Sequence, residues 1–315
     1  MNSMLFDDIQ LEHLQKTGMR STDADNKRRS YAQRLNRLGC IRSLVQIPRL
    51  NSFDKLDKEM PNFSEVTTYI RGQVALRKMG SVGARGMGLV PILLQGAPGV
   101  GKTRYAQQLA LVLKVSFHEI AFATTTAAFV LKGSSLQWGE GQPGRVFEIL
   151  ADSVHINPLV LLDEVDKSMR SSFPPINTLY ELLEPNQSAR FQDEALVPVT
   201  LDASHIIWVL TANEPQLIPE AIISRCRVFD VPIPSRDQVG DIAQSVYKDV
   251  LKGQPWAKKF EKTLCDEVVD KLSAMPPREM RKVISEALGC AALSGLKAIT
   301  VDAIATHKKT RKIGF

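Results

Sequence analysis

Apolar residues between positions 90 and 231 form short continuous runs, and segments with helical spacing separate these runs. Short apolar runs bounded by turn residues are typical of strands that are buried on both faces. Their alternation with helices predicts a parallel sheet covered by helices. We expect strands at Val90–Gln95, Ser116–Ala121, Leu159–Leu162, His205–Thr211 and Val228–Val231, helices at Thr103–Lys114, Gly144–Ser153 and Pro174–Glu184, and a hairpin-like pair at residues 189–194 and 196–201.

From Ser235 onward the strand pattern stops, and only helical spacing remains. Helices are expected at Asp237–Leu251, Leu264–Ala274, Arg278–Ser294 and Val301–Lys309, the last of them capped by Thr300. The fold class is therefore α/β, with a parallel sheet followed by a small all-helical subdomain. The expected domains are an N-terminal appendage or linker at 1–60, an α/β domain at 61–234 and a helical domain with a basic tail at 235–315.

The first 60 residues show less regular patterning than the centre of the chain. Thr22 is a candidate N-cap for a helix from Asp23 to Leu38 that Gly39 would end. Residues 47–63 contain two prolines and predict an irregular linker. An amphipathic helix is expected next, over residues 63–79.

Composition narrows the class of protein. The 315 residues carry a net charge of +6, with 44% hydrophobic and 23% charged residues, which are globular values. Asp7, Asp8 and Glu12 would interrupt the apolar part of a signal peptide, and no apolar run is long enough to span a bilayer. We therefore expect a cytoplasmic protein without a membrane segment. The four cysteines are isolated, which argues against disulfides and zinc sites.

Positive charge is concentrated at the two ends of the sequence. Residues 1–60 contain 11 basic and 8 acidic side chains, and residues 252–315 contain 13 and 7. Such ends could bind nucleic acid, but solvated helix faces account for the same charges.

Residues 96–103 read GAPGVGKT, which fits the phosphate-binding pattern GxxxxGK[ST] between an expected strand and an expected helix. The glycines allow backbone N–H groups to surround phosphate oxygens, and the helix N-terminus adds partial positive charge. Lys102 would match the charge of the β- and γ-phosphates of ATP, and Thr103 would bind Mg²⁺. The expected nucleotide-binding residues are Gly96, Ala97, Pro98, Gly99, Val100, Gly101, Lys102, Thr103 and, from the next motif, Asp163.

That second motif is PLVLLDEVDK, an apolar strand that ends in two carboxylates. Asp163 is expected to hold Mg²⁺, and Glu164 to orient and deprotonate the attacking water. The strand of IIWVLTANEP ends near Asn213, whose amide could bind the γ-phosphate or the water. An ordinary turn after a strand is the alternative for Asn213.

From about Pro91 to Pro234 these motifs resemble the AAA+ ATPases and, within them, the ATPase module of Lon protease. The resemblance rests on LKGSSLQWGEGQPGRVFEIL, NPLVLLDEVDK, LYELLEPNQSARFQDEALVPVTLD and IPEAIISRCRVFDVPIP, which occur in that order. It implies a magnesium-dependent ATPase whose Walker A and Walker B motifs lie on a P-loop sheet, followed by a helical lid.

The resemblance also implies roles for further residues. Asn213 corresponds to the residue called sensor 1. Arg225 matches the arginine finger that reaches the nucleotide of a neighbouring subunit, with Arg227 as the alternative. Arg278 matches the lid arginine called sensor 2, and Arg281 is its competitor.

Trp138 occupies the position of the aromatic residue in the substrate-gripping pore loop, where the family has tyrosine. Packing in a core is the other reading of this tryptophan. We favour the pore loop because its neighbours are polar or glycine.

Nothing in the sequence resembles the serine–lysine protease domain or the large N-terminal domain of Lon, so we expect no peptidase activity. The resemblance implies a homo-oligomeric ring, with a hexamer as the expected form, that remodels or threads an unidentified protein client. A nucleic-acid-directed ATPase, similar to clamp loaders or transposition-accessory proteins, and an ATP-dependent scaffold stay as alternatives.

Overall fold

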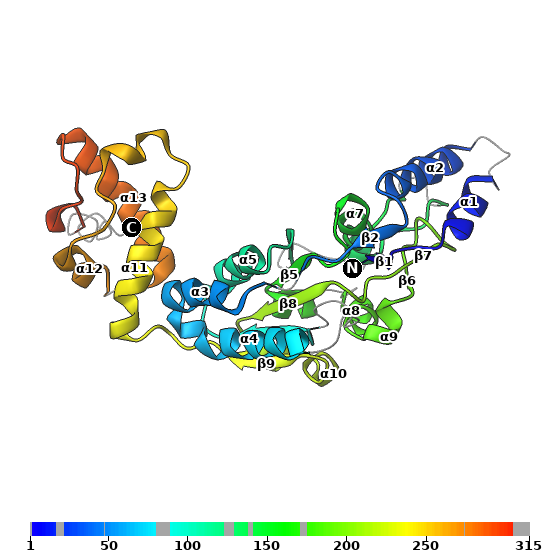
Figure 1. Cartoon of the computed structure of the whole chain (residues 1–315), viewed down its shortest axis with the longest axis horizontal. Helices are drawn as coiled ribbons and strands as arrows, with labels where there is room; N and C mark the ends of the chain where they lie inside the picture. Colours follow the sequence, from blue (N-terminus) through cyan, green and yellow to red (C-terminus); the bar gives the residue numbers. More distant parts are fainter. Residues whose placement is uncertain are drawn as a thin grey trace. The chain divides into compact units, whose positions relative to one another are not determined.

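The protein divides into two compact units (Figure 1). The structure is a computed structural model, and it describes residues 2–16, 22–46, 48–79, 89–122, 129–137, 141–170, 175–273 and 275–304. The first unit, here called the sheet unit, contains Met1–Ser52, Thr68–Gln95 and Ala106–Asp230. The second, here called the helical unit, contains Phe53–Thr67, Gly96–Tyr105 and Val231–Phe315. The domain division expected from the sequence stays a prediction.

Five parallel strands form the centre of the sheet unit, in the order β4-β5-β8-β3-β9. They are β3 (Ile92–Gln95), β4 (Phe117–Ala121), β5 (Leu159–Asp163), β8 (Ile207–Ala212) and β9 (Arg227–Asp230). Each strand runs parallel to its neighbours, so the carboxyl ends of all five lie at one edge of the sheet. All six residues of β8 are buried, as the continuous apolar runs predict for a sheet covered on both faces. The α/β fold expected from the sequence is confirmed.

Short helices cover this sheet, because their apolar residues recur at helical spacing. In α7 (Arg145–Asp152), the buried residues Val146, Phe147, Ile149 and Leu150 join the same core cluster as the strands. The remaining elements of this layer are α6 (Phe129–Lys132), α8 (Ile176–Leu182), α9 (Pro185–Ser188) and α10 (Glu220–Ile223), with the hairpin β6 (Phe191–Gln192) and β7 (Thr200–Leu201). Two longer helices, α4 (Ser64–Met79) and α5 (Lys102–Leu113), begin in the helical unit and continue in the sheet unit.

The N-terminal segment belongs to the core of the sheet unit. Strand β1 (Asn2–Met4) pairs antiparallel with β2 (Ile41–Ser43), and between them lie α1 (Asp8–Lys16) and α2 (Asp23–Asn36). Thr22 caps α2 as expected, since its Oγ1 accepts a hydrogen bond from the Asp25 N–H at 3.2 Å. The buried side chains that this segment adds to the core are Leu5, Phe6, Leu11, Ala32, Leu35 and Leu44.

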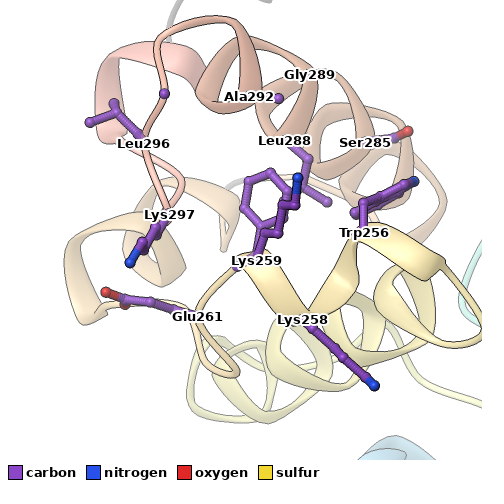
Figure 2. A pocket seen from close by; sticks show the side chains of 12 residues that line it. Trp256, Lys258, Lys259, Glu261, Ser285, Leu288, Gly289, Ala292, Leu296 and Lys297 are labelled. Carbon is purple, nitrogen blue, oxygen red and sulfur yellow. The ribbon is translucent and has the colours of Figure 1, made fainter.

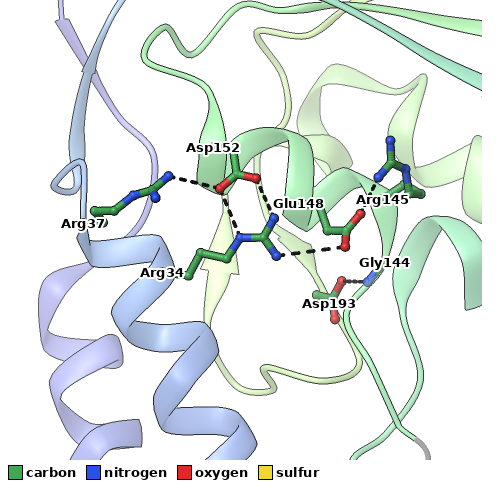
Figure 3. Close-up of polar contacts among 7 residues, drawn as sticks. All are labelled: Arg34, Arg37, Gly144, Arg145, Glu148, Asp152 and Asp193. Atoms are coloured by element: carbon green, nitrogen blue, oxygen red, sulfur yellow. Dashed lines mark hydrogen bonds and ion pairs between the residues drawn. The ribbon is translucent and has the colours of Figure 1, made fainter.

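Charged contacts join α2 to α7 at the surface of the same unit (Figure 3). Arg34 Nε and Nη2 donate to the two carboxylate oxygens of Asp152, at 3.0 and 2.5 Å, and Arg37 adds a contact at 3.3 Å. Beneath them the guanidinium group of Arg42, which is 2% exposed, donates to the carbonyl groups of Gly39, Leu35 and Ser153. These contacts join α2 and β2 to the end of α7 within the sheet unit.

In the helical unit α11 (Arg236–Leu251), α12 (Asp266–Leu272) and α13 (Pro277–Leu293) enclose a separate core. Ser235 and Gln238 form a capping box at the start of α11. The helix expected at Val301–Lys309 begins in the described part of the chain, where Ala303 N–H donates to Thr300 Oγ1 at 3.4 Å, and its later residues lie outside the described ranges.

The expected irregular linker at residues 47–63 is wrong. This stretch contains the 3₁₀ turns η1 (Leu50–Phe53) and η2 (Pro61–Phe63) and the helix α3 (Asp54–Glu59). Burial of Leu56, Met60 and Phe63 explains the regular structure, because ordering the chain here removes three large apolar side chains from water.

No helix in the described ranges combines the length and the apolar character that crossing a bilayer requires.

Replacing Leu35 with alanine should destabilise the sheet unit, because Leu35 is fully buried and its loss leaves a cavity. We expect the free energy of unfolding, measured by urea titration, to fall by about 2–5 kcal/mol. Leu76→Ala removes the same atoms from a side chain that is 62% exposed, and should lower the free energy of unfolding by less than about 0.5 kcal/mol. Equal effects of the two substitutions would mean that the N-terminal helices do not contribute to the core.

Candidate nucleotide-binding and catalytic site

The glycine-rich loop lies between β3 and α5, as the sequence predicts. Strand β3 ends at Gln95, and α5 begins at Lys102. Gly99 and Gly101 adopt φ values of +85° and +106°, which side chains other than glycine rarely tolerate. At Gly96 a Cβ atom would lie 2.5 Å from the Val231 carbonyl oxygen. The backbone of this loop therefore requires glycine at three positions.

Lys102 is held inside the loop. Its side chain is 7% exposed, and its Nζ donates to the carbonyl oxygens of Gly96 at 2.6 Å and Ala97 at 3.2 Å. Thr103 follows it in the first turn of α5 and is half-buried, while Ala97 and Pro98 are exposed. A loop that surrounds one ammonium group can accept an anion of matching charge, as phosphate sites do.

Two side chains tie the loop region to the rest of the helical unit. Arg104 donates from Nε to Asp249 Oδ2 at 2.9 Å and from Nη2 to Ser245 Oγ at 2.7 Å, both on α11. Asn62 Nδ2 donates to the carbonyl groups of Val100 and Pro232, each at 3.3 Å. Neither residue was among the expected site residues, because the contacts join segments far apart in the sequence.

Arg278, the expected sensor 2 residue, lies near this loop. A Cβ atom on Gly99 would be 3.7 Å from the Cβ of Arg278, which is the second residue of α13 and is exposed. Arg281 is exposed one turn later on the same helix. This proximity favours Arg278 over Arg281 for a contact with bound nucleotide.

In the sheet unit, the carboxyl ends of β5 and β8 carry a connected set of polar side chains. Thr211 Oγ1 donates to Asp163 Oδ1 at 2.6 Å and accepts the Glu164 backbone N–H at 2.8 Å. Asn213 Nδ2 donates to Glu164 Oε1 at 3.1 Å. The structure thus brings Asp163, Glu164 and Asn213 together, as the sequence predicts, and adds Thr211.

Glu164 has an unusual backbone, with φ at +55°. A residue other than glycine in this left-handed region stores strain that neighbouring contacts must offset. Glu164 makes such contacts with both its backbone and its side chain, because its N–H donates to Thr211 Oγ1 and its Oε1 accepts from Asn213 Nδ2. The turn directs the Glu164 carboxylate toward Asn213 at the edge of the sheet.

A second residue that sequence reasoning missed supports this edge. Asp166 is fully buried, and its carboxylate accepts backbone N–H groups of Asn213 at 3.4 Å and Glu214 at 3.2 Å. Asp166 thereby fixes the turn after β8. Its position in DEVDK, two residues after the predicted acidic pair, was the available signal.

The two candidate finger arginines differ in their surroundings. Arg225 follows α10 and is partly exposed; Nη1 donates to Ala221 O at 2.6 Å, and Nε lies 3.8 Å from Glu184 Oε2. Its guanidinium lies 5.6 Å from the centre of the Tyr180 ring. Arg227, in β9, is exposed and lies over the rings of Tyr69 and Phe229 at 5.9 and 5.5 Å.

Trp138, the expected pore-loop residue, lies outside the described residues. The two stems of its loop are described, and they are hydrogen-bonded to each other. Ser134 N–H donates to the Gln142 carbonyl at 2.9 Å, and Gln142 N–H donates to Ser134 Oγ at 3.2 Å. These two hydrogen bonds join the described residues on either side of positions 138–140.

Asp193 anchors this loop from the end of β6. Its fully buried carboxylate accepts the N–H group of Gly144 at 2.7 Å (Figure 3) and that of Ala195 at 2.9 Å. A Cβ atom on Gly133, at the other stem, would lie 2.5 Å from Asp193 Oδ1, so the glycine is needed for close approach. Burial raises the pKa of Asp193 to about 7, despite the two N–H donors. Charges on Glu194 and Glu148 act in the same direction.

The pKa of Asp193 predicts a pH dependence of stability. An aspartate in the unfolded chain has a pKa near 4, so between about pH 4 and pH 7 the folded state holds the extra proton. The free energy of unfolding should therefore fall as pH rises through this window. In Asp193→Asn this fall should disappear, so the urea midpoint of unfolding, measured from about pH 4 to pH 7, should depend less on pH than in wild type. Exposed Asp270→Asn is the control, and parallel profiles for wild type and Asp193→Asn would contradict the assignment.

Residues 92–233 match the family model of the AAA proteins, the ATPase family associated with various cellular activities. The chain is 31% identical over 212 residues to the Lon protease of Mycolicibacterium smegmatis, which covers 67% of this chain and 27% of that protein. It is 30% identical over 228 residues to the mitochondrial Lon protease homolog of Yarrowia lipolytica. This match covers 72% of this chain and 19% of that protein. The chain therefore spans about a quarter or less of the length of these relatives.

Solved structures with the same fold include the closed state of Hsp104 with ATPγS and casein, with a TM-score of 0.61 and 16% sequence identity. This match covers 78% of this chain and 48% of the Hsp104 chain. Another is the Holliday junction branch migration motor RuvB of Thermotoga maritima, with a TM-score of 0.52 and 15% sequence identity. This match covers 80% of this chain and 70% of the RuvB chain. At such identities these two structures show the fold alone. The sequence matches identify residues 92–233 as part of an AAA+ ATPase module similar to that of Lon protease.

Proposed function

We propose that this chain is a magnesium-dependent ATPase subunit of a homo-oligomeric ring, a hexamer, that remodels or threads a protein partner. The observation that carries the proposal is the hydrogen-bonded set of Asp163, Glu164, Thr211 and Asn213 at one edge of the sheet. Strand β3 of the same sheet leads directly into the glycine-rich loop. These are the two halves that ATP hydrolysis on a P-loop fold requires.

In this proposal Glu164 accepts a proton from the attacking water, while the amide group of Asn213 orients the carboxylate. Lys102 and the loop N–H groups hold the phosphates. Thr103 and Asp163 would hold Mg²⁺, which would neutralise charge on the triphosphate. The donors fit this cation, because Mg²⁺ prefers oxygen ligands and keeps several waters.

Ring assembly is proposed from Arg225, which would reach the nucleotide of the neighbouring subunit. In the described part of the chain its Nε has no hydrogen-bond partner, although Nη1 donates to Ala221. An arginine suits this task because its planar group keeps its charge and can contact two phosphate oxygens. Arg227 stays as the alternative, and Arg278 would close the helical lid onto ATP.

Protein remodelling is proposed from the loop that carries Trp138. An aromatic residue in a ring channel can grip a polypeptide without reading its sequence. The closed stem at Ser134 and Gln142 and the Asp193 anchor would transmit movement of the sheet unit to that loop. The similarity to Lon relatives and the Hsp104 structure with casein support a protein client. We place the protein in the cytoplasm as part of the same proposal.

Nucleic-acid binding is the second candidate, and the fold similarity to RuvB together with the basic ends of the chain favours it. A DNA motor would show ATPase stimulation by DNA and a steep loss of DNA affinity with salt.

Glu164→Gln tests the proposed function. The glutamine keeps an oxygen that can accept from Asn213 but cannot take a proton, so ATP should bind while hydrolysis falls at least about 100-fold. Sedimentation with ATP should show a stabilised ring. Exposed Glu267→Gln is the control and should hydrolyse ATP normally. Hydrolysis that survives Glu164→Gln would refute the catalytic role of Glu164. A wild-type chain that stays monomeric in ATP would refute the ring. Stimulation of ATP hydrolysis by DNA rather than by an unfolded protein would favour the second candidate.

Thr211→Val should impair catalysis, although Thr211 would not touch ATP. Valine has a similar shape but cannot donate to Asp163 or accept from the Glu164 N–H. We expect kcat to fall at least about tenfold, with a smaller change in ATP affinity, and a loss of about 1–3 kcal/mol in stability. Thr178→Val, at another buried threonine, is the control. Normal kcat in Thr211→Val would show that the hydroxyl does not position the acidic pair.

A further inference from the structure

A pocket with a volume of about 960 Å³ opens on the helical unit, and none of the residues assigned above lines it (Figure 2). Its two sides are the segment 256–261, after α11, and the stretch 285–297, at the end of α13 and in the following turn. The volume is at the upper end of the range that small-molecule and anchor-residue sites occupy.

The pocket offers apolar surface to a ligand. Leu288 is buried at its floor, whereas Trp256 and Leu296 are 39% and 47% exposed. Phe260 packs edge-to-face against Trp256, with ring centres 5.7 Å apart and an interplanar angle of 80°. This contact holds the indole ring in one place, so a bound side chain would bury Trp256 and Leu296 at a small cost in ordering.

Positive charge surrounds this apolar surface. Lys258, Lys259 and Lys297 line the pocket and are exposed, against one acidic lining residue, Glu261. Figure 2 shows Lys259 near the centre of the view, with Leu288 above it and Trp256 to its right. Within the described ranges none of the three lysines forms an ion pair, so their ammonium groups are available to an anionic partner.

We propose that this pocket binds an acidic segment of a partner protein that carries a bulky apolar anchor residue. The anchor enters between Trp256 and Leu296, and flanking carboxylates lie against the lysines. Such a combination of a buried apolar anchor and a charged rim is typical of peptide recognition. The pocket goes beyond the proposed function, because it is a separate contact for a partner and takes no part in the ATP cycle.

The apolar walls favour a peptide over a nucleic acid. Single-stranded nucleic acids bind to rows of exposed aromatic faces along a basic groove. Here the two rings meet edge-to-face, and the opposite wall contains Leu288, Ala292 and Leu296. Aliphatic walls match a leucine or phenylalanine side chain better than a base with polar edges.

Fluorescence anisotropy with the full chain tests this proposal without ATP, so its outcome is independent of the ATPase assignment. The probe is a short labelled peptide of Glu, Leu and Phe, and the comparison probes are the same peptide with Lys for Glu and a single-stranded oligonucleotide. We expect the acidic peptide to bind at least about tenfold more tightly than the lysine peptide, and its affinity to fall with salt.

Variants locate the binding. Ala292→Trp fills the pocket from an exposed helix position and should weaken acidic-peptide binding at least about tenfold. Lys259→Glu should weaken it severalfold, and Lys271→Glu on α12, outside the pocket, should not. The proposal is overturned if the two peptides bind equally, if only the oligonucleotide binds, or if Ala292→Trp and Lys259→Glu, both folded by circular dichroism, bind like wild type.

Discussion

One hydroxyl group, that of Thr211, determines how the two acidic residues at the end of β5 are presented. It donates to Asp163 and accepts from the backbone of Glu164, so a single buried side chain on β8 fixes both. The arrangement depends on the parallel register of β5 and β8, which pairs Leu162 with Leu210 and places the next residues side by side. With that register shifted by one residue, the hydroxyl would point to the other face of the sheet.

The left-handed backbone of Glu164 is the most strained feature of this edge. The Glu164 N–H donates to Thr211, its side chain accepts from Asn213, and buried Asp166 holds the turn that carries Asn213. Strain that neighbouring contacts maintain is characteristic of sites where one side-chain direction matters. At this edge the Glu164 carboxylate is therefore held in one direction by a backbone conformation that residues other than glycine rarely adopt.

In the helical unit, contacts between distant segments restrain the glycine-rich loop. Asn62 binds the loop at Val100, and Arg104 joins the first turn of α5 to α11. Arg278 lies near Gly99 at the start of α13. A change in the backbone of this loop would therefore alter its contacts with α11 and α13.

The sequence by itself determined the parts whose chemistry is local. Continuous apolar strands predicted the parallel sheet, and GAPGVGKT predicted a loop whose glycines the backbone requires. The acidic pair of β5 was also visible, because the end of a buried strand can be read from one short segment.

Only the tertiary structure decided which distant groups meet. Thr211 stands 48 residues from Asp163, and Asp193 stands 49 from Gly144, so no local pattern could pair them. The capping signals Thr22 and Gly39 predicted a helix at α2 but not that Leu35 would enter the core of the sheet unit. Apolar periodicity specifies that a face must be buried, and the partner surface depends on the packing of the whole chain.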